Sequence, residues 1–93
     1  MDMIHVDGKD RGPIYLYALS TCGWCAKTKE LLTTLGVAFD YVFVDLLPKV
    51  EMEQTYSEML QLYNPLGSFP TLVVNGKVII GYQENEIREA LAE

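Results

Sequence analysis

Hydrophobic and polar positions follow a pattern along the first half of the chain that predicts a strand, a helix and a second strand. Residues 14–19 form a nearly continuous apolar run, which is typical of a strand buried on both faces. Apolar residues then recur at helical spacing over residues 23–35, and Gly36 suits the position just after a helix. Residues 37–44 are again apolar and branched. Such a βαβ unit predicts two parallel strands joined by a right-handed crossover.

The next segment predicts an amphipathic helix. Pro48 fits a first helical turn, where its missing N–H does no harm. Apolar residues between positions 52 and 63 then recur every three or four residues, while the intervening glutamates, Glu58 among them, are expected to face water. Asn64, followed by a proline, ends this helix.

The last third of the chain predicts a hairpin and a short helix. Residues 71–74 and 77–80 are apolar runs separated by Asn-Gly, which readily forms a type I′ turn. Residues 84–93 predict the final helix. We therefore expect one α/β domain over residues 1–93, with a four-stranded mixed sheet and helices on both faces. Residues 3–6 are consistent with a short extra edge strand.

Composition and charge narrow the function classes. Hydrophobic residues make up 49% of the chain, as in a globular protein, and no apolar run approaches the roughly 20 residues needed to span a bilayer. The formal net charge of −6 disfavours binding to nucleic acid or to an acidic membrane. The charged N-terminal region lacks the apolar core of a signal peptide, so we expect a cytoplasmic location. We also expect the protein to be a monomer.

Two cysteines, Cys22 and Cys25, are the main candidates for chemistry. With only His5 to add, they do not complete a four-ligand structural zinc site. In a reducing cytosol a C-x-x-C pair is more often catalytic than a permanent disulfide. The alternative is a pair of cysteines without a role, which their position between a strand and a helix disfavours.

The position of the pair assigns each cysteine a task. Cys22 falls at the start of a helix, where unpaired N–H groups and the helix dipole favour a thiolate, so we predict a partly exposed nucleophile. Cys25 lies one turn later and deeper, where it would resolve a mixed disulfide on Cys22. Gly23 and Trp24 shape the turn between them, and Trp24 is expected to offer substrates an apolar contact.

Three segments give the chain a family resemblance. Residues 21–25, 68–71 and 81–85 match, in order and spacing, the active-site turn, the proline loop and the glycine-containing turn of glutaredoxins and glutaredoxin-like redoxins. The resemblance implies a thioredoxin-like fold and a cis peptide bond between Phe69 and Pro70, whose backbone would receive an extended substrate. The pattern alone equally allows Pro70 to be the first residue of a strand.

The same resemblance bears on glutathione. Many glutathione-using members carry a basic residue three positions before the first cysteine, where this chain has Leu19. Of the segment that grips the glutathione amine end, only Gly81 and Glu84 match, and Tyr82 takes the place of a second glycine. We therefore expect no tightly bound cofactor, with glutathione as one candidate co-substrate. Candidate electron donors are the glutathione system, a thioredoxin reductase and a ferredoxin-linked reductase.

The leading hypothesis is thus a dithiol reductase of protein disulfides, with Gly81 and Tyr82 beside Phe69 and Pro70 in the substrate site. Alternatives are a glutathione-dependent deglutathionylase, which needs only the first cysteine, and a [2Fe–2S] protein holding its cluster between two subunits.

Three further side chains have alternative interpretations. Tyr17 is expected in the core rather than at the sulfur site, and His5 at the surface. Lys27, close to the second cysteine, has two possible roles: part of a solvated helix face or support for a thiolate.

Overall fold

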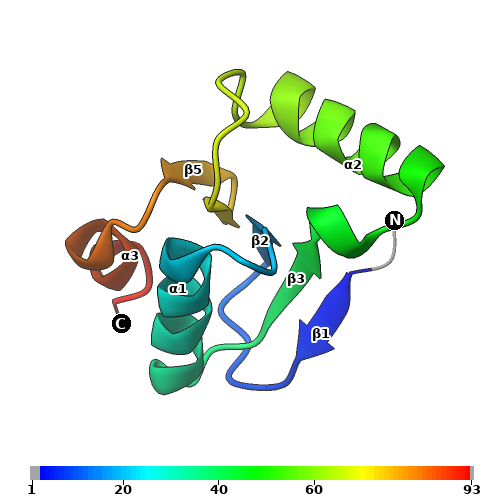
Figure 1. The fold of residues 1–93 in the computed structure, drawn as a ribbon. Coiled ribbons are helices and arrows are strands. Elements are labelled where there is room, and N and C mark those ends of the chain that lie inside the picture. The colour runs from blue at the N-terminus through cyan, green and yellow to red at the C-terminus, as the bar shows by residue number, and fades with distance from the viewer. Residues whose placement is uncertain (1–2, 93) are drawn as a thin grey trace.

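The computed structural model describes residues 3–92 as a five-stranded sheet with helices on both faces (Figure 1). The elements in chain order are β1 (Ile4–Val6), β2 (Ile14–Ala18), α1 (Gly23–Thr34), β3 (Phe39–Phe43), the 3₁₀ turn η1 (Val44–Leu46), α2 (Lys49–Leu62), β4 (Thr71–Val74), β5 (Lys77–Ile80) and α3 (Glu84–Ala90). Within this described part no helix is long and apolar enough to cross a membrane.

The sheet has the strand order β1-β3-β2-β4-β5. β2 and β3 are parallel, as the βαβ pattern predicts, and β4 and β5 form the predicted antiparallel hairpin. Asn75 and Gly76 have φ values of 50° and 86°, which fits a type I′ turn. The sheet contains the four expected strands and one more, β1. β1 pairs antiparallel with β3 at the edge, because residues 3–6 supply the short extra strand that the sequence allows.

The two faces of the sheet carry separate cores. On one face α1 and α3 bury a cluster that includes Leu32, Ile87 and Cys25. On the other face α2 buries a smaller cluster around Met59 and Tyr17. Figure 1 shows α1 and α3 together on one side of the sheet and α2 on the other. Strands that are covered on both faces explain why residues 14–19 are almost wholly apolar.

Several predicted boundaries differ from the structure. The second predicted strand ends at Phe43 rather than at residue 44, because Val44 begins a 3₁₀ turn. Pro48 precedes α2 as its N-cap instead of lying within its first turn. Glu58 was expected to face water, but it is half-buried and accepts a 3.5 Å hydrogen bond from the Tyr17 hydroxyl. These differences depend on tertiary contacts, which local patterns do not reveal.

Candidate active site

Cys22 lies at the N-cap of α1, directly after the turn that follows β2. Its backbone is extended, and its N–H donates to the Leu19 carbonyl at 3.2 Å. The Cys25 N–H donates to the Cys22 sulfur, also at 3.2 Å. The sulfur thus takes the place that a serine or aspartate oxygen holds at an ordinary N-cap, where a negative charge is favoured. Cys22 is half-buried, so its sulfur lies within reach of a substrate.

Cys25 lies one turn further along α1 and is only 1% exposed. Burial, together with the hydrogen bond to Cys22, raises the pKa of the Cys25 thiol to about 12. Cys25 is therefore a neutral thiol near pH 7. Both cysteines are free in this structure, and their unequal burial matches the prediction from the sequence.

The loop before β4 faces this turn with a free stretch of backbone. The Phe69–Pro70 peptide bond is cis, as the resemblance implies. The Pro70 carbonyl accepts a hydrogen bond of 2.9 Å from the Gly81 N–H. Among residues 3–92, no group hydrogen-bonds to the N–H or C=O of Phe69. A donor and an acceptor thus remain available on one residue, as the addition of an extended chain requires.

Asn64 holds the Phe69–Pro70 loop in place from a fully buried position. Its amide nitrogen donates to the Ser68 carbonyl at 3.1 Å, the Ser68 hydroxyl at 3.2 Å and the Thr71 hydroxyl at 2.9 Å. Its oxygen accepts from the Leu66 N–H at 3.0 Å. In the sequence Asn64 is recognisable only as the end of a helix. The neighbouring proline masked its role, because Asn-Pro is an ordinary turn signal.

The five predicted substrate residues other than Gly23 line one open groove of about 250 Å³: Trp24, Phe69, Pro70, Gly81 and Tyr82. The Trp24 and Tyr82 rings stack at 5.7 Å with 20° between their planes. Trp24 is 60% exposed, so the stacked pair forms an aromatic wall open to solvent. Gly23 lies outside this groove and is exposed in the first turn of α1.

Comparison with known proteins identifies the family. The glutaredoxin family model matches residues 14–79. The chain belongs to the glutaredoxin family. It is 53% identical to methanoredoxin of Methanosarcina acetivorans, with a TM-score of 0.87 over 92% of this chain and 90% of that one. It is 52% identical to the glutaredoxin of Methanosarcina mazei Go1, with a TM-score of 0.87 over 98% of this chain and 88% of that one.

A curated relative extends the comparison to a bacterium. An uncharacterized glutaredoxin-like 8.6 kDa protein in the rubredoxin operon of Clostridium pasteurianum is 32% identical over 74 residues, which cover 80% of this chain and 91% of that protein. The two solved structures confirm the thioredoxin-like fold of the glutaredoxins.

One polar contact of this glutaredoxin site was missed in the sequence. The Asp45 carboxylate accepts hydrogen bonds from the Ser20 N–H at 2.9 Å and from the Ser20 hydroxyl at 2.5 Å. These bonds lower the pKa of the Asp45 carboxyl below its ordinary value. They tie the turn before Cys22 to η1. No local pattern signals this pair, because 25 residues separate its members.

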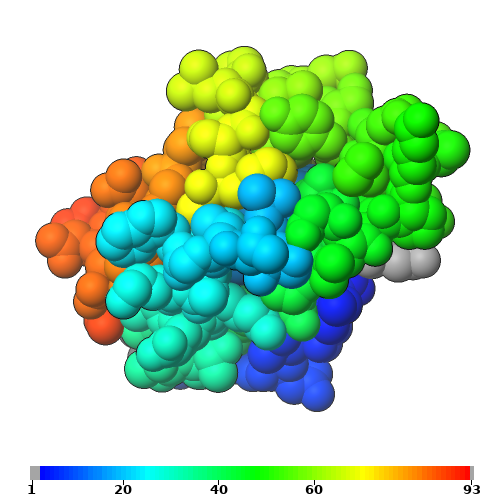
Figure 2. Space-filling model, viewed as in Figure 1, coloured from blue at the N-terminus to red at the C-terminus, as the bar shows by residue number. Residues whose placement is uncertain are grey.

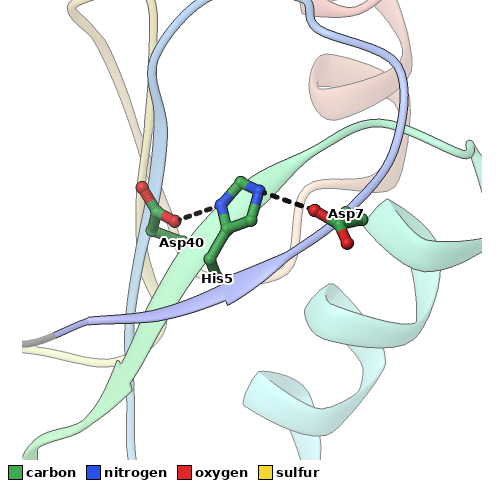
Figure 3. Close-up of polar contacts among 3 residues, drawn as sticks. All are labelled: His5, Asp7 and Asp40. Carbon is green, nitrogen blue, oxygen red and sulfur yellow. Dashed lines mark hydrogen bonds and ion pairs between the residues drawn. The ribbon is translucent and has the colours of Figure 1, made fainter.

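Three other candidates lie away from the sulfur atoms of the glutaredoxin dithiol. Tyr17 is buried in the α2-side core, as expected. Lys27 borders a hollow that also contains Glu84 and Arg88, so it faces α3. His5 lies on the β1 edge, where its ring nitrogens contact Asp40 at 2.7 Å and Asp7 at 3.2 Å (Figure 3).

No group of three potential metal ligands occurs within residues 3–92. The [2Fe–2S] alternative would therefore need thiols from a second subunit and from glutathione in addition to Cys22. Cys22 is the accessible cysteine that each subunit would supply.

Proposed function

We propose that this glutaredoxin reduces protein disulfides through a dithiol–disulfide cycle of Cys22 and Cys25. The observation that supports the proposal is the inequality of the two cysteines. One is accessible at a helix N-terminus, and the other is a buried thiol one turn below. The N–H of Cys25 donates to the Cys22 sulfur at 3.2 Å, so the two residues are already close in the reduced protein.

The cycle transfers two electrons. The Cys22 thiolate attacks one sulfur of the substrate disulfide, forming a mixed disulfide and expelling the other substrate sulfur as a thiolate. Cys25 then loses its proton to solvent and attacks the Cys22 sulfur. That step forms the Cys22–Cys25 disulfide and releases the second substrate thiolate. The substrate is reduced by two electrons, and the protein dithiol is oxidised by two.

The substrate would lie along the loop opposite the dithiol. The Phe69 N–H and C=O are free to pair with an extended polypeptide, as an added strand. The groove walled by the stacked Trp24 and Tyr82 rings offers an apolar contact beside that strand. Protein disulfides supply such an extended backbone on both sides of the cysteine.

A protein reductase is our preferred electron donor. Leu19 offers no positive charge to a glutathione carboxylate. The Glu84 carboxylate already forms an ion pair with Arg88 at 2.9 Å and accepts a hydrogen bond from Tyr82 at 3.3 Å. Because Arg88 offsets its negative charge, Glu84 is less available to a glutathione amine. We propose a thioredoxin reductase or a ferredoxin-linked reductase as donor, in a cytoplasmic setting, with glutathione as the alternative co-substrate.

The test is the reduction of insulin and of a small model disulfide by the wild-type protein, Cys22→Ser and Cys25→Ser. Three donors are compared: glutathione with its reductase, a thioredoxin reductase with NADPH, and a ferredoxin-linked reductase. We expect Cys22→Ser to lose more than about 10³-fold of the activity, since no other accessible thiol replaces it.

The same panel separates the alternatives. If the protein is a dithiol reductase, Cys25→Ser should no longer catalyse repeated turnovers of insulin reduction. A glutathione-dependent deglutathionylase keeps its activity with glutathione in that variant. If the wild-type protein and Cys22→Ser reduced disulfides equally, the proposed cycle would be wrong.

A further inference from the structure

A second groove lies on the other side of Phe69 from the aromatic one. It has a volume of about 250 Å³ and is lined by Leu19, Val44, Asp45, Met52, Glu53, Tyr56 and Phe69. It shares Leu19 with the turn that precedes Cys22, and Phe69 with the free backbone opposite. Because Phe69 lines both grooves, a chain that pairs with its backbone would lie next to each of them, with this groove on the α2 side.

The walls of this groove are apolar. The Tyr56 ring stacks on Phe69 with 6.0 Å between centroids, and its hydroxyl donates to the Gly67 carbonyl at 3.0 Å. The only polar group of Tyr56 is thus already paired, which leaves its ring to the groove. Half-buried Leu19 and Met52 complete the apolar surface. A side chain that enters this groove contacts mainly carbon atoms, so an apolar side chain fits it best.

The edge of the groove carries two carboxylates and no cation. Asp45 and Glu53 both line it and are both exposed. Neither forms an ion pair with any residue in the described part of the chain. Hydrogen bonds from Ser20 keep Asp45 in its charged form by lowering the pKa of its carboxyl. The edge therefore attracts a positive charge and repels a negative one.

Two exposed apolar residues lie on η1 and at the start of α2, the same segments that contribute Asp45 and Met52 to the groove. Leu46 and Val50 are 66% and 65% exposed. In Figure 2 the active-site turn, coloured light blue to cyan, lies at the centre of the visible face. The green segment of η1 and early α2 lies to its right, and the yellow segment before β4 lies above it. Exposed apolar residues beside a groove are typical of a surface that binds a polypeptide.

Building on the proposed function, we propose that this α2-side groove selects protein substrates. It would bind an apolar side chain next to the disulfide cysteine, with a lysine or arginine of the same substrate paired to Asp45 and Glu53. The occupant is thus a basic, apolar polypeptide segment. A short acidic thiol compound, by contrast, would make few contacts with the apolar walls, and its carboxylate would be repelled by Asp45 and Glu53.

The test uses three peptides in which a central cysteine carries a mixed disulfide with the coloured thiol 5-thio-2-nitrobenzoate. On each side of the cysteine, the adjacent residue and the one beyond it are leucine and lysine in the first peptide, serine and lysine in the second, and serine and glutamate in the third. The kcat/KM of each peptide is divided by its uncatalysed rate with dithiothreitol, which removes differences in intrinsic reactivity. We expect the leucine–lysine peptide to exceed the serine–lysine peptide about tenfold, as burial of one leucine-sized side chain allows.

Two variants of the groove and one matched control sharpen the result. Glu53→Lys should reduce the preference for serine–lysine over serine–glutamate roughly threefold, as expected for an exposed charge. Glu51→Lys makes the same charge change on the same helix, outside the groove, and should leave the preference unchanged. Met52→Gln keeps the side-chain length and should reduce the advantage of leucine.

The outcomes distinguish a failure of the groove proposal from a failure of the proposed dithiol cycle. If all three peptides reacted equally, or if Glu53→Lys and Glu51→Lys behaved alike, the groove proposal would be overturned while the dithiol cycle survived. If the wild-type protein reduced none of the peptides and no small disulfide, the proposed function itself would fail.

Discussion

Two regions of this molecule carry residue types that often perform catalysis, and only one of them has the structure of a site. At one end of the sheet, Cys22 and Cys25 face the Phe69–Pro70 loop. At the β1 edge, His5 lies between two aspartates, an arrangement that resembles a proton relay (Figure 3). The dithiol has one buried partner and grooves beside it, whereas at the β1 edge His5 and Asp7 are exposed and Asp40 is only half-buried.

The comparison shows that two reactive groups acquire different chemical roles when one of them is buried and several segments of the chain meet around them. Desolvation holds Cys25 as a thiol beside an accessible Cys22. His5 and Asp40 are directly opposite each other on β1 and β3, so their contact is an exposed cross-strand pair. The following predictions test this contrast.

The largest expected effect is in alkylation of the two thiols. With a pKa of about 12, only about one Cys25 side chain in 10⁴ is a thiolate at pH 8. We expect iodoacetamide to label Cys22 more than about a hundredfold faster than Cys25, because the thiolate is the reactive form. Peptide mass spectrometry over time measures both rates.

Unfolding provides the control for this experiment. In concentrated urea the two cysteines should react at similar rates, since burial no longer separates them. Equal rates in the folded protein, or faster labelling of Cys25, would contradict the inequality on which the cycle depends.

A smaller effect is expected in Asn64→Ala. The substitution removes the amide that holds Ser68 and Thr71, leaves the buried Thr71 hydroxyl with only its bond to the Ser68 carbonyl, and opens a cavity at a fully buried position. We expect a loss of about 2 kcal/mol in the free energy of unfolding. Activity should fall as well, since the same loop carries Phe69. Urea denaturation measures the change in stability.

Asn85→Ala is the matched control, because Asn85 is exposed in α3. We expect this variant to remain within about 0.5 kcal/mol of the wild-type protein. A stable and fully active Asn64→Ala would show that the loop does not need the buried amide.

The smallest effect is expected at the β1 edge. The hydrogen bond to Asp40, and the nearby negative charges, raise the pKa of His5 above its ordinary value of 6.5. A raised pKa means that the folded state holds the proton more tightly than the unfolded state. The resulting stabilisation is fully present below about pH 6.5 and is lost as the pH rises through the folded-state pKa.

His5→Asn should therefore lower the urea midpoint slightly at pH 5.5 and leave it nearly unchanged at pH 8.5. Disulfide reduction should stay at the wild-type level at both values. A large loss of activity in His5→Asn would contradict the view that this edge takes no part in the chemistry.

Much of the fold could be predicted because its signals are local. The apolar run of residues 14–19, the Asn75-Gly76 turn and the cysteine spacing each lie within a few neighbouring positions. The same holds for the segment with the cis bond at Pro70, which the family resemblance identified. The depths of Cys22 and Cys25 also followed, since one helical turn sets them.

The remaining features depend on residues that are far apart in the sequence. Ser20 and Asp45 are 25 residues apart, and Tyr17 and Glu58 are 41 apart. Neither pair leaves a pattern in its own segment. The α2-side groove likewise arises only when η1, α2 and the Phe69 loop come together.

Trapping the intermediate tests the central claim most directly. Reduced Cys25→Ser is mixed with an oxidised protein substrate, and the products are identified by non-reducing mass spectrometry. The proposed cycle predicts a stable mixed disulfide on Cys22, whereas the wild-type protein accumulates an internal Cys22–Cys25 disulfide with no lasting adduct. A wild-type protein that never forms the internal disulfide, or a Cys25→Ser variant without an adduct on Cys22, would contradict it.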